Sequence, residues 1–239
     1  MRALGGATAT LALFRLTTLR FVRSRVLWVA ALFAFLPLLP FAFSAGAGDD
    51  PHTRWADYFE VISYVHMLVA ALLMAPVVAE EIEEKTYTYL WSRPIPRWSV
   101  LAGKLMSGAT LAGLILTASA LAATAVTGLA DSALLLQGIA ALLLGALCVG
   151  CVSASLGIFM PKHSLAISIT YFLLLDSMVG AMPFAGARMS VMHNVLAISG
   201  HGPDKNSFAV SLAWLGGVAV FWTLLAIWNL GRKELSTGS

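Results

Sequence analysis

Charged residues are scarce in this sequence. Only 11% of its 239 residues are Asp, Glu, Lys or Arg, whereas 59% are hydrophobic. An ordinary soluble domain has about a quarter charged residues, so this chain could not keep a globular surface in water. The composition therefore excludes a soluble enzyme, a disordered chain and a nucleic-acid-binding protein. It indicates an all-α integral membrane protein.

Cysteine is scarce as well, with two residues in the chain, which excludes a disulfide-framed secreted scaffold. Cys148 and Cys151 are three residues apart and would share one side of a helix, an arrangement that suits a soft ion such as copper(I). No histidine or carboxylate accompanies them in the same apolar stretch. Because small cysteines are common in apolar helices, the pair favours packing, and we expect no metal site.

Long uncharged runs are abundant. A helix needs about 20 apolar residues to cross a bilayer core, and the sequence predicts six such spans in a single domain covering residues 1–239. The predicted spans are residues 26–43, 61–79, 105–130, 133–159, 165–184 and 208–230. A turn at Asp131-Ser132 is expected to separate the third span from the fourth.

The distribution of basic residues predicts the orientation. Basic residues are enriched in cytoplasmic loops, and with six spans and the N-terminus inside, only Arg54, Arg188 and Lys205 of the 15 Lys and Arg fall outside. Both termini are therefore expected in the cytoplasm. Residues 8–25 interleave arginines with apolar residues and are predicted to form an amphipathic helix on the inner leaflet.

Residues 80–104 form the only long cytoplasmic loop and contain a high density of charge. Ile82, Thr86, Tyr89 and Leu90 recur at helical spacing, and Pro94 then ends the pattern. A short amphipathic helix with flanking charge, held beside the membrane, is suited to docking on a partner. The alternative is a solvated loop whose aromatic residues lie at the membrane interface.

An ordered series of residues runs through this loop. The acidic pair Glu80-Glu81 is followed by Thr86 and Leu90, then by Arg93-Pro94 and Arg97, and Gly103-Lys104 opens the third span. The series resembles the cytoplasmic loop of the permease subunits of type-2 ATP-binding-cassette (ABC) exporters. Lys85 and Pro96 stand where that family usually has glycine and serine.

The resemblance implies that the loop carries a coupling helix, which docks on a separate ATPase subunit and passes its movements to the spans. The implied ATPase-coupling residues are Glu80, Glu81, Glu83, Glu84, Thr86, Tyr89 and Leu90. The implied loop anchors, which would contact inner-leaflet phosphates or the neighbouring interfacial helix, are Arg93, Pro94, Arg97, Gly103 and Lys104. The resemblance also implies two ATPase copies, a second permease copy or a sister permease, and the bacterial inner membrane.

The chain itself is not expected to be an enzyme. A Walker-type ATP site needs G-x-x-x-x-G-K-[ST]. The only Gly-Lys pair is Gly103-Lys104, and Trp98 and Leu105 occupy the positions that require glycine and Ser/Thr. ATP and Mg²⁺ are therefore expected on the partner ATPase, and no cofactor is expected on this chain.

Two ionisable residues lie inside predicted spans. A carboxylate near the middle of a span is costly, so Asp176 is a candidate for the substrate path. Alternatively, Asp176 is a hydrogen-bonded residue of the bundle, with Tyr171 or Ser177 as its neighbour. His66 is a weaker candidate for the same path.

Residues 185–207 form a long outer segment with an apolar pattern at helical spacing. In the resembling family, short re-entrant helices at this place form an outer gate. The resemblance implies that Arg188, Met192, His193 and Asn194 belong to such a gate. The simpler alternative is an interfacial loop.

Two other functional classes compete with transport. An intramembrane hydrolase would need a Ser/His arrangement, for which Ser199 and His201 are candidates, but no Gly-x-Ser-x-Gly elbow occurs. A non-transporting membrane anchor or assembly factor is the other alternative. The loop of residues 80–104 favours the exporter permease over both.

Overall fold

The computed structural model describes residues 6–43, 50–83, 97–183, 185–202 and 208–235. Within these ranges every element is helical, as the composition predicts. In chain order the elements are α1 (Gly6–Arg23), α2 (Arg25–Phe35), α3 (Leu38–Phe43), α4 (Pro51–Met74), α5 (Pro76–Glu83), α7 (Arg97–Thr127), α8 (Ser132–Phe159), η1 (Pro161–His163), α9 (Ser164–Thr170), η2 (Tyr171–Asp176), α10 (Ser177–Ala181), η3 (Ala185–Met189), α11 (Val191–Ile198) and α12 (Phe208–Leu235).

Five segments of the described chain are long and apolar enough to cross a membrane. They are Pro51–Met74, Trp98–Thr127, Ser132–Phe159, Pro161–Ala181 and Phe208–Leu230. The turn predicted at Asp131-Ser132 is present, because the Asp131 carboxylate accepts the N–H of Ala133 at 2.8 Å and caps α8. Gly128 precedes this turn with a φ of 77°, a left-handed conformation that suits the residue after a helix.

The predicted first span is not one continuous helix. Residues 26–43 form α2 and α3, which are separated at Leu36 and Pro37. Proline has no N–H and its ring clashes with the carbonyl four residues earlier, so Pro37 ends the helical hydrogen bonding of α2. Neither piece alone reaches the length of a span, and the expectation of an uninterrupted helix at this place was wrong. The six-span count stays a prediction.

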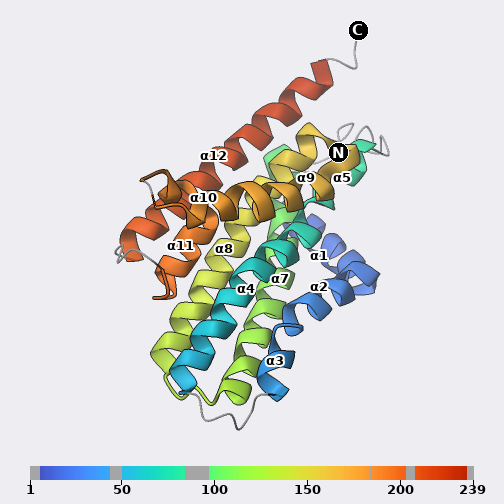
Figure 1. Ribbon diagram of the computed structural model, residues 1–239. Helices are drawn as coiled ribbons and strands as arrows, with labels where there is room; N and C mark the ends of the chain where they lie inside the picture. The colour runs from blue at the N-terminus through green and yellow to red at the C-terminus, as the bar shows by residue number, and fades with distance from the viewer. Residues whose placement is uncertain (1–5, 44–49, 84–96, 184, 203–207, 236–239) are drawn as a thin grey trace.

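Helix α8 lies at the centre of the bundle, between α4, α7, α11 and α12 (Figure 1). Its small residues allow this close packing, because an added Cβ at Gly138 would lie 2.9 Å from the Trp55 ring, and one at Gly157 would lie 2.6 Å from the Ala75 carbonyl oxygen. A Cβ added at Gly150 would likewise collide with the thioether of Met74. These three glycines of α8 therefore pack against other helices of the same chain.

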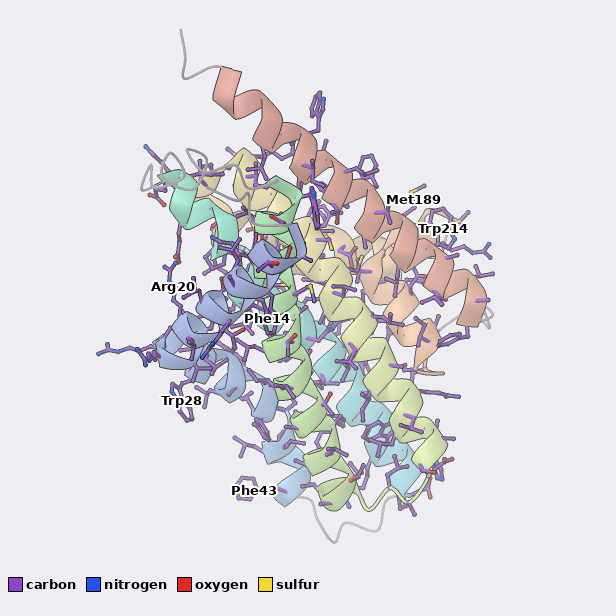
Figure 2. All side chains as sticks on the ribbon, turned by 180° about the vertical axis from the view of Figure 1, so that it is seen from behind. Phe14, Arg20, Trp28, Phe43, Met189 and Trp214 are labelled. Atoms are coloured by element: carbon purple, nitrogen blue, oxygen red, sulfur yellow. The ribbon has the colours of Figure 1, made fainter. Side chains whose placement is uncertain are left out.

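Helices α1 and α2 lie on the outside of the bundle, with α1 across α7 (Figure 2). Ser119 on α7 holds α2 in place, because its hydroxyl donates to the Ala34 carbonyl at 2.6 Å and contacts the Tyr58 hydroxyl at 3.0 Å. Trp28 and Phe43 project away from the bundle, with 74% and 88% of their surfaces exposed. An apolar chain that exposes such side chains requires a lipid or protein cover.

The segment after α8 is irregular. It begins with the 3₁₀ turn η1, continues as α9, widens into the π-helix η2, and ends in α10. The outer segment then contains η3 and α11, and α11 packs against α8, α12 and α4. Residues 184 and 203–207 lie outside the described ranges.

Candidate functional site at the root of the loop and around α11

The root of the loop of residues 80–104 is the junction of α5, α7 and α1. Helix α5 follows α4 almost directly, and α7 begins on the other side of the loop. Lys104 connects the two sides, because its Nζ donates to the carbonyl oxygen of Val77 at 2.9 Å. Lys104 is 4% exposed, so its ammonium lies between α5 and α7 and not at lipid phosphates.

Helix α1 packs closely against this root. A Cβ at Gly103 would lie 2.6 Å from the carbonyl oxygen of Thr10, so only glycine allows this approach of α7 to α1. One turn further along α7, the hydroxyls of Thr18 and Ser107 contact each other at 2.9 Å. Gly103 therefore lies in the contact between α7 and α1, and its role as a loop anchor stays a prediction.

An ion pair joins α1 to α5. The guanidinium of Arg20 contacts the carboxylate of Glu80, and the two residues are 60 positions apart in the sequence. Both side chains are largely exposed, so the pair contributes little stability by itself. Its position matters more, since it connects α1 to the acidic residues of α5 at the start of the loop.

The middle of the loop is not described. Glu84, Thr86, Tyr89, Leu90, Arg93 and Pro94 lie outside the described residues. Glu81 and Arg97 lie in α5 and α7, but their side chains are outside the description. Glu83 is exposed at the end of α5. Of the predicted loop residues, the structure therefore places the side chains of Glu80, Glu83 and Lys104, together with Gly103.

Asp176 caps the N-terminus of α11. Its Oδ1 accepts the backbone N–H of Val191 at 2.9 Å, and its Oδ2 accepts that of Met192 at 3.0 Å. The Ser190 hydroxyl lies 3.0 Å from both Oδ2 and the main-chain oxygen of Asp176. A carboxylate is favourable at this place because the first N–H groups of a helix lack internal partners.

The hydroxyl that binds the Asp176 carboxylate comes from outside its own helix. Ser190, 14 residues later, is the hydroxyl that the carboxylate contacts, whereas Ser177 bonds the carbonyl of Leu173 and Tyr171 packs edge-on against Phe172 and Trp222. Local reasoning placed the partner within one helical turn, and the tertiary fold supplies it from another helix.

His66 lies deep in the bundle between α4, α8 and α11. The His66 ring lies against Gly145 of α8, close to Val195 of α11. A Cβ added at Gly145 would lie 2.8 Å from His66 Nε2 and 2.5 Å from the Val195 side chain. His66 Nδ1 contacts the Ser63 carbonyl, and Nε2 has no hydrogen-bond partner among the described residues. The structure does not pair His66 with Asp176.

The residues expected to form an outer gate divide into two groups. Arg188 is exposed on η3, whereas Met192, His193 and Asn194 are buried on α11. The Asn194 amide donates to the carbonyl oxygens of Arg188 at 2.7 Å and Ser190 at 2.8 Å, which ties α11 to the turn before it. Within the described chain, both ring nitrogens of His193 lack a hydrogen-bond partner.

Ser199 and His201 are close, with the Ser199 hydroxyl 3.2 Å from His201 Nδ1. The hydroxyl also donates to the Leu196 carbonyl at 2.9 Å, and Ser199 is 1% exposed. A hydroxyl has one proton, so Ser199 accepts from the imidazole here, the reverse of the arrangement that a nucleophilic serine needs. Burial lowers the pKa of His201, whose ring stacks on Phe59 with centroids 5.5 Å apart.

Cys148 and Cys151 are both buried in α8 as free thiols. Among the residues that the structure describes, no three His, Cys, Asp or Glu side chains are grouped in a way that would hold a metal ion.

Two important residues were not identified from the sequence. Ser190 precedes an apolar helical pattern, and serine is a preferred N-cap residue, so the signal was available. Arg20 was assigned only to the predicted helix of residues 8–25, and no sequence signal connects it to a carboxylate 60 residues away.

Comparison with known proteins supplies the family. Residues 42–199, which contain the elements from α4 to α11, match the family described as ABC-2 family transporter protein. No curated protein matches the chain significantly. The match covers well over half of the sequence and agrees with the apolar helices of the bundle. The chain therefore belongs to the ABC-2 transporter family and is a multi-pass membrane protein.

Proposed function

We propose that this chain is the permease subunit of an ATP-driven exporter, in which a separate ATPase subunit hydrolyses ATP and the loop of residues 80–104 receives its movement. Membership of the ABC-2 family supports the transport role. The arrangement at the root of the loop supports the coupling role: Lys104 bonds α5, and Arg20 pairs with Glu80.

The proposed path of coupling runs from the loop into the spans. Helix α5 is separated from α4 only by Ala75. The N–H of Ala75 donates to the carbonyl oxygen of Ala71 at 2.9 Å, so the helical hydrogen bonding of α4 continues up to the start of α5. A displacement of the loop would therefore be passed to α4 on one side and to α7 on the other. Helix α1, which packs against α7 and is joined to α5 by the Arg20–Glu80 ion pair, would hold the root together while it moves.

The assembly would contain two ATPase copies and a second permease copy or a sister permease. Both termini would lie in the cytoplasm, and ATP with Mg²⁺ would bind the ATPase chains. The distribution of basic residues supports this orientation. Asp176 and His66 would border the path of the cargo, with η3 and α11 at its outer end.

Co-purification tests the coupling role. The tagged chain is expressed with the ATPase encoded beside it, and the ATPase that is retained and its turnover are measured in detergent. The double change Thr86→Asp with Leu90→Asp is expected to abolish retention, because it places charge on the proposed docking face. Thr53→Asp, an exposed change at the start of α4, is the control and is expected to retain the ATPase. If the wild-type chain retains no ATPase, the anchor reading becomes the better explanation.

A further inference from the structure

The buried face of the segment Pro161–Ala181 repeats every four residues. Four residues are buried at this spacing: Ser164, Ser168, Phe172 and Asp176. Gly180 follows one step later, where α10 contacts α11 (Figure 1). In an α-helix, positions four apart drift around the axis by about 40° at each step. The π-helix η2 reduces this drift because its turns are wider, and it therefore keeps Asp176 and Gly180 facing α11.

The hydrogen bonds of η2 leave an α-helical form within reach. The N–H of Ser177 donates to the carbonyl oxygen of Phe172, five residues earlier, and also contacts that of Leu174. In an α-helix the same N–H would donate to Leu173, four residues earlier. The Leu173 carbonyl is already beside Ser177, because it accepts the Ser177 hydroxyl. Exchange of one acceptor for its neighbour would therefore begin to rewind the turn.

Rewinding would change which side chains face α11. Loss of the π-turn rotates the residues after it by about 100°, which is one residue position. Leu175 would then replace Asp176, and the first N–H groups of α11 would lose their carboxylate acceptor. Val179 would replace Gly180 beside Ser190. An added Cβ at Gly180 would already lie 2.5 Å from the Ser190 hydroxyl oxygen, so α11 would have to move away to admit Val179.

We propose that η2 is a two-state switch, which holds α11 against the bundle as a π-helix and releases it as an α-helix. π-Helices are rare, and the cap bonds to Val191 and Met192 offset the cost of this one. In the α-helical form Asp176 would take the half-buried position of Ser177. A carboxylate without such bonds inside a span is costly, so the π form is the more stable of the two. The switch belongs to this chain and does not rest on an ATPase.

The first test compares deletion of Leu174 with Leu174→Ala by hydrogen exchange of the α11 amides in the purified chain. The deletion shortens η2 by one residue, so an α-helix then presents Asp176 and Gly180 to α11 in the native orientation, and the released form is lost. Leu174→Ala removes the same exposed side chain but keeps the residue count. Exchange of α11 is expected to be slower in the deletion variant, on the order of tenfold.

A second test covers the case in which the deletion variant does not fold. Gly180→Ala places a Cβ against Ser190 and favours the released form. Exchange of α11 should then become faster while exchange of η2 becomes slower, because release is tied to α-helical bonding in η2. Gly216→Ala, where an added Cβ meets nothing within 4 Å, is the control and should change neither.

Two results would overturn the switch. One is exchange of α11 in the deletion variant that is as fast as in Leu174→Ala, or faster. The other is faster exchange of α11 and η2 together in Gly180→Ala, since simple loosening of the packing would have that effect. Neither measurement includes an ATPase, so failure here leaves the coupling proposal standing, and the reverse also holds.

Discussion

Removal of the Asp176 carboxylate should detach the N-terminus of α11 from the apolar segment Pro161–Ala181. In Asp176→Ala, the N–H groups of Val191 and Met192 lose acceptors at 2.9 and 3.0 Å. Each buried donor left without a partner costs about 1–3 kcal/mol. The Ser190 hydroxyl keeps the main-chain oxygen of Asp176 as an acceptor, so it adds little. The expected loss of unfolding free energy is therefore about 2–6 kcal/mol.

The chain contains a matched control for this change. Asp131 caps α8 by accepting N–H groups in the same way, but it is exposed, so water replaces its carboxylate in Asp131→Ala. The expected cost there is about 1 kcal/mol. Asp176→Asn keeps one acceptor oxygen and should fall between wild type and Asp176→Ala. Unfolding in mixed detergent micelles measures the three free energies, and hydrogen exchange of residues 191–198 shows whether the loss is local to α11.

One result would refute this reasoning. If Asp176→Ala unfolds like wild type and α11 exchanges no faster, the cap contributes nothing and the contacts around Ser190 are not those of the folded protein. If transport or stimulated ATP turnover is lost at the same time, the carboxylate acts on the cargo path, as its position in a span first predicted. The stability measurement therefore separates the capping role from the transport role of one residue.

The sequence predicted the elements that depend on local chemistry. Each of the five candidate spanning segments overlaps a predicted apolar run, although α4 begins at Pro51 and not at residue 61. The polar pair Asp131-Ser132 located the turn between α7 and α8. The prediction of an uninterrupted first span failed because length and hydropathy were given more weight than Pro37, although a proline inside a helix is a visible local signal.

The contacts of the candidate site depend on the tertiary fold. Asp176 and Ser190 come from segments separated by α10 and η3, and Arg20 and Glu80 come from helices separated by three further helices. Any carboxylate could in principle meet any of several arginines or hydroxyls, and periodicity within one helix does not distinguish among them. Arg20 reaches Glu80 from α1, the helix that packs closely on α7 at Gly103.

Three further changes test other parts of the structure. Gly150→Val adds a side chain against the Met74 thioether and should cost about 1–3 kcal/mol in unfolding free energy. Gly216→Val is its control, because an added Cβ there meets no other atom within 4 Å. Equal stability of the two variants would contradict the packing of Gly150 on Met74. Arg20→Glu should lower ATPase stimulation more than stability, because the pair with Glu80 is exposed, and Arg20→Glu with Glu80→Arg should restore stimulation if the contact itself carries the coupling. Burial lowers the pKa of His201, so the folded protein favours the neutral ring while the unfolded chain takes up a proton at a pH of about 6.5. The contribution of His201 to the unfolding free energy should therefore be complete above that pH and fall as the pH decreases below it. His201→Phe keeps an aromatic ring to stack on Phe59 and should remove this part of the pH dependence in unfolding measurements between about pH 5 and 8. An unchanged pH profile in the variant would show that other groups cause the dependence.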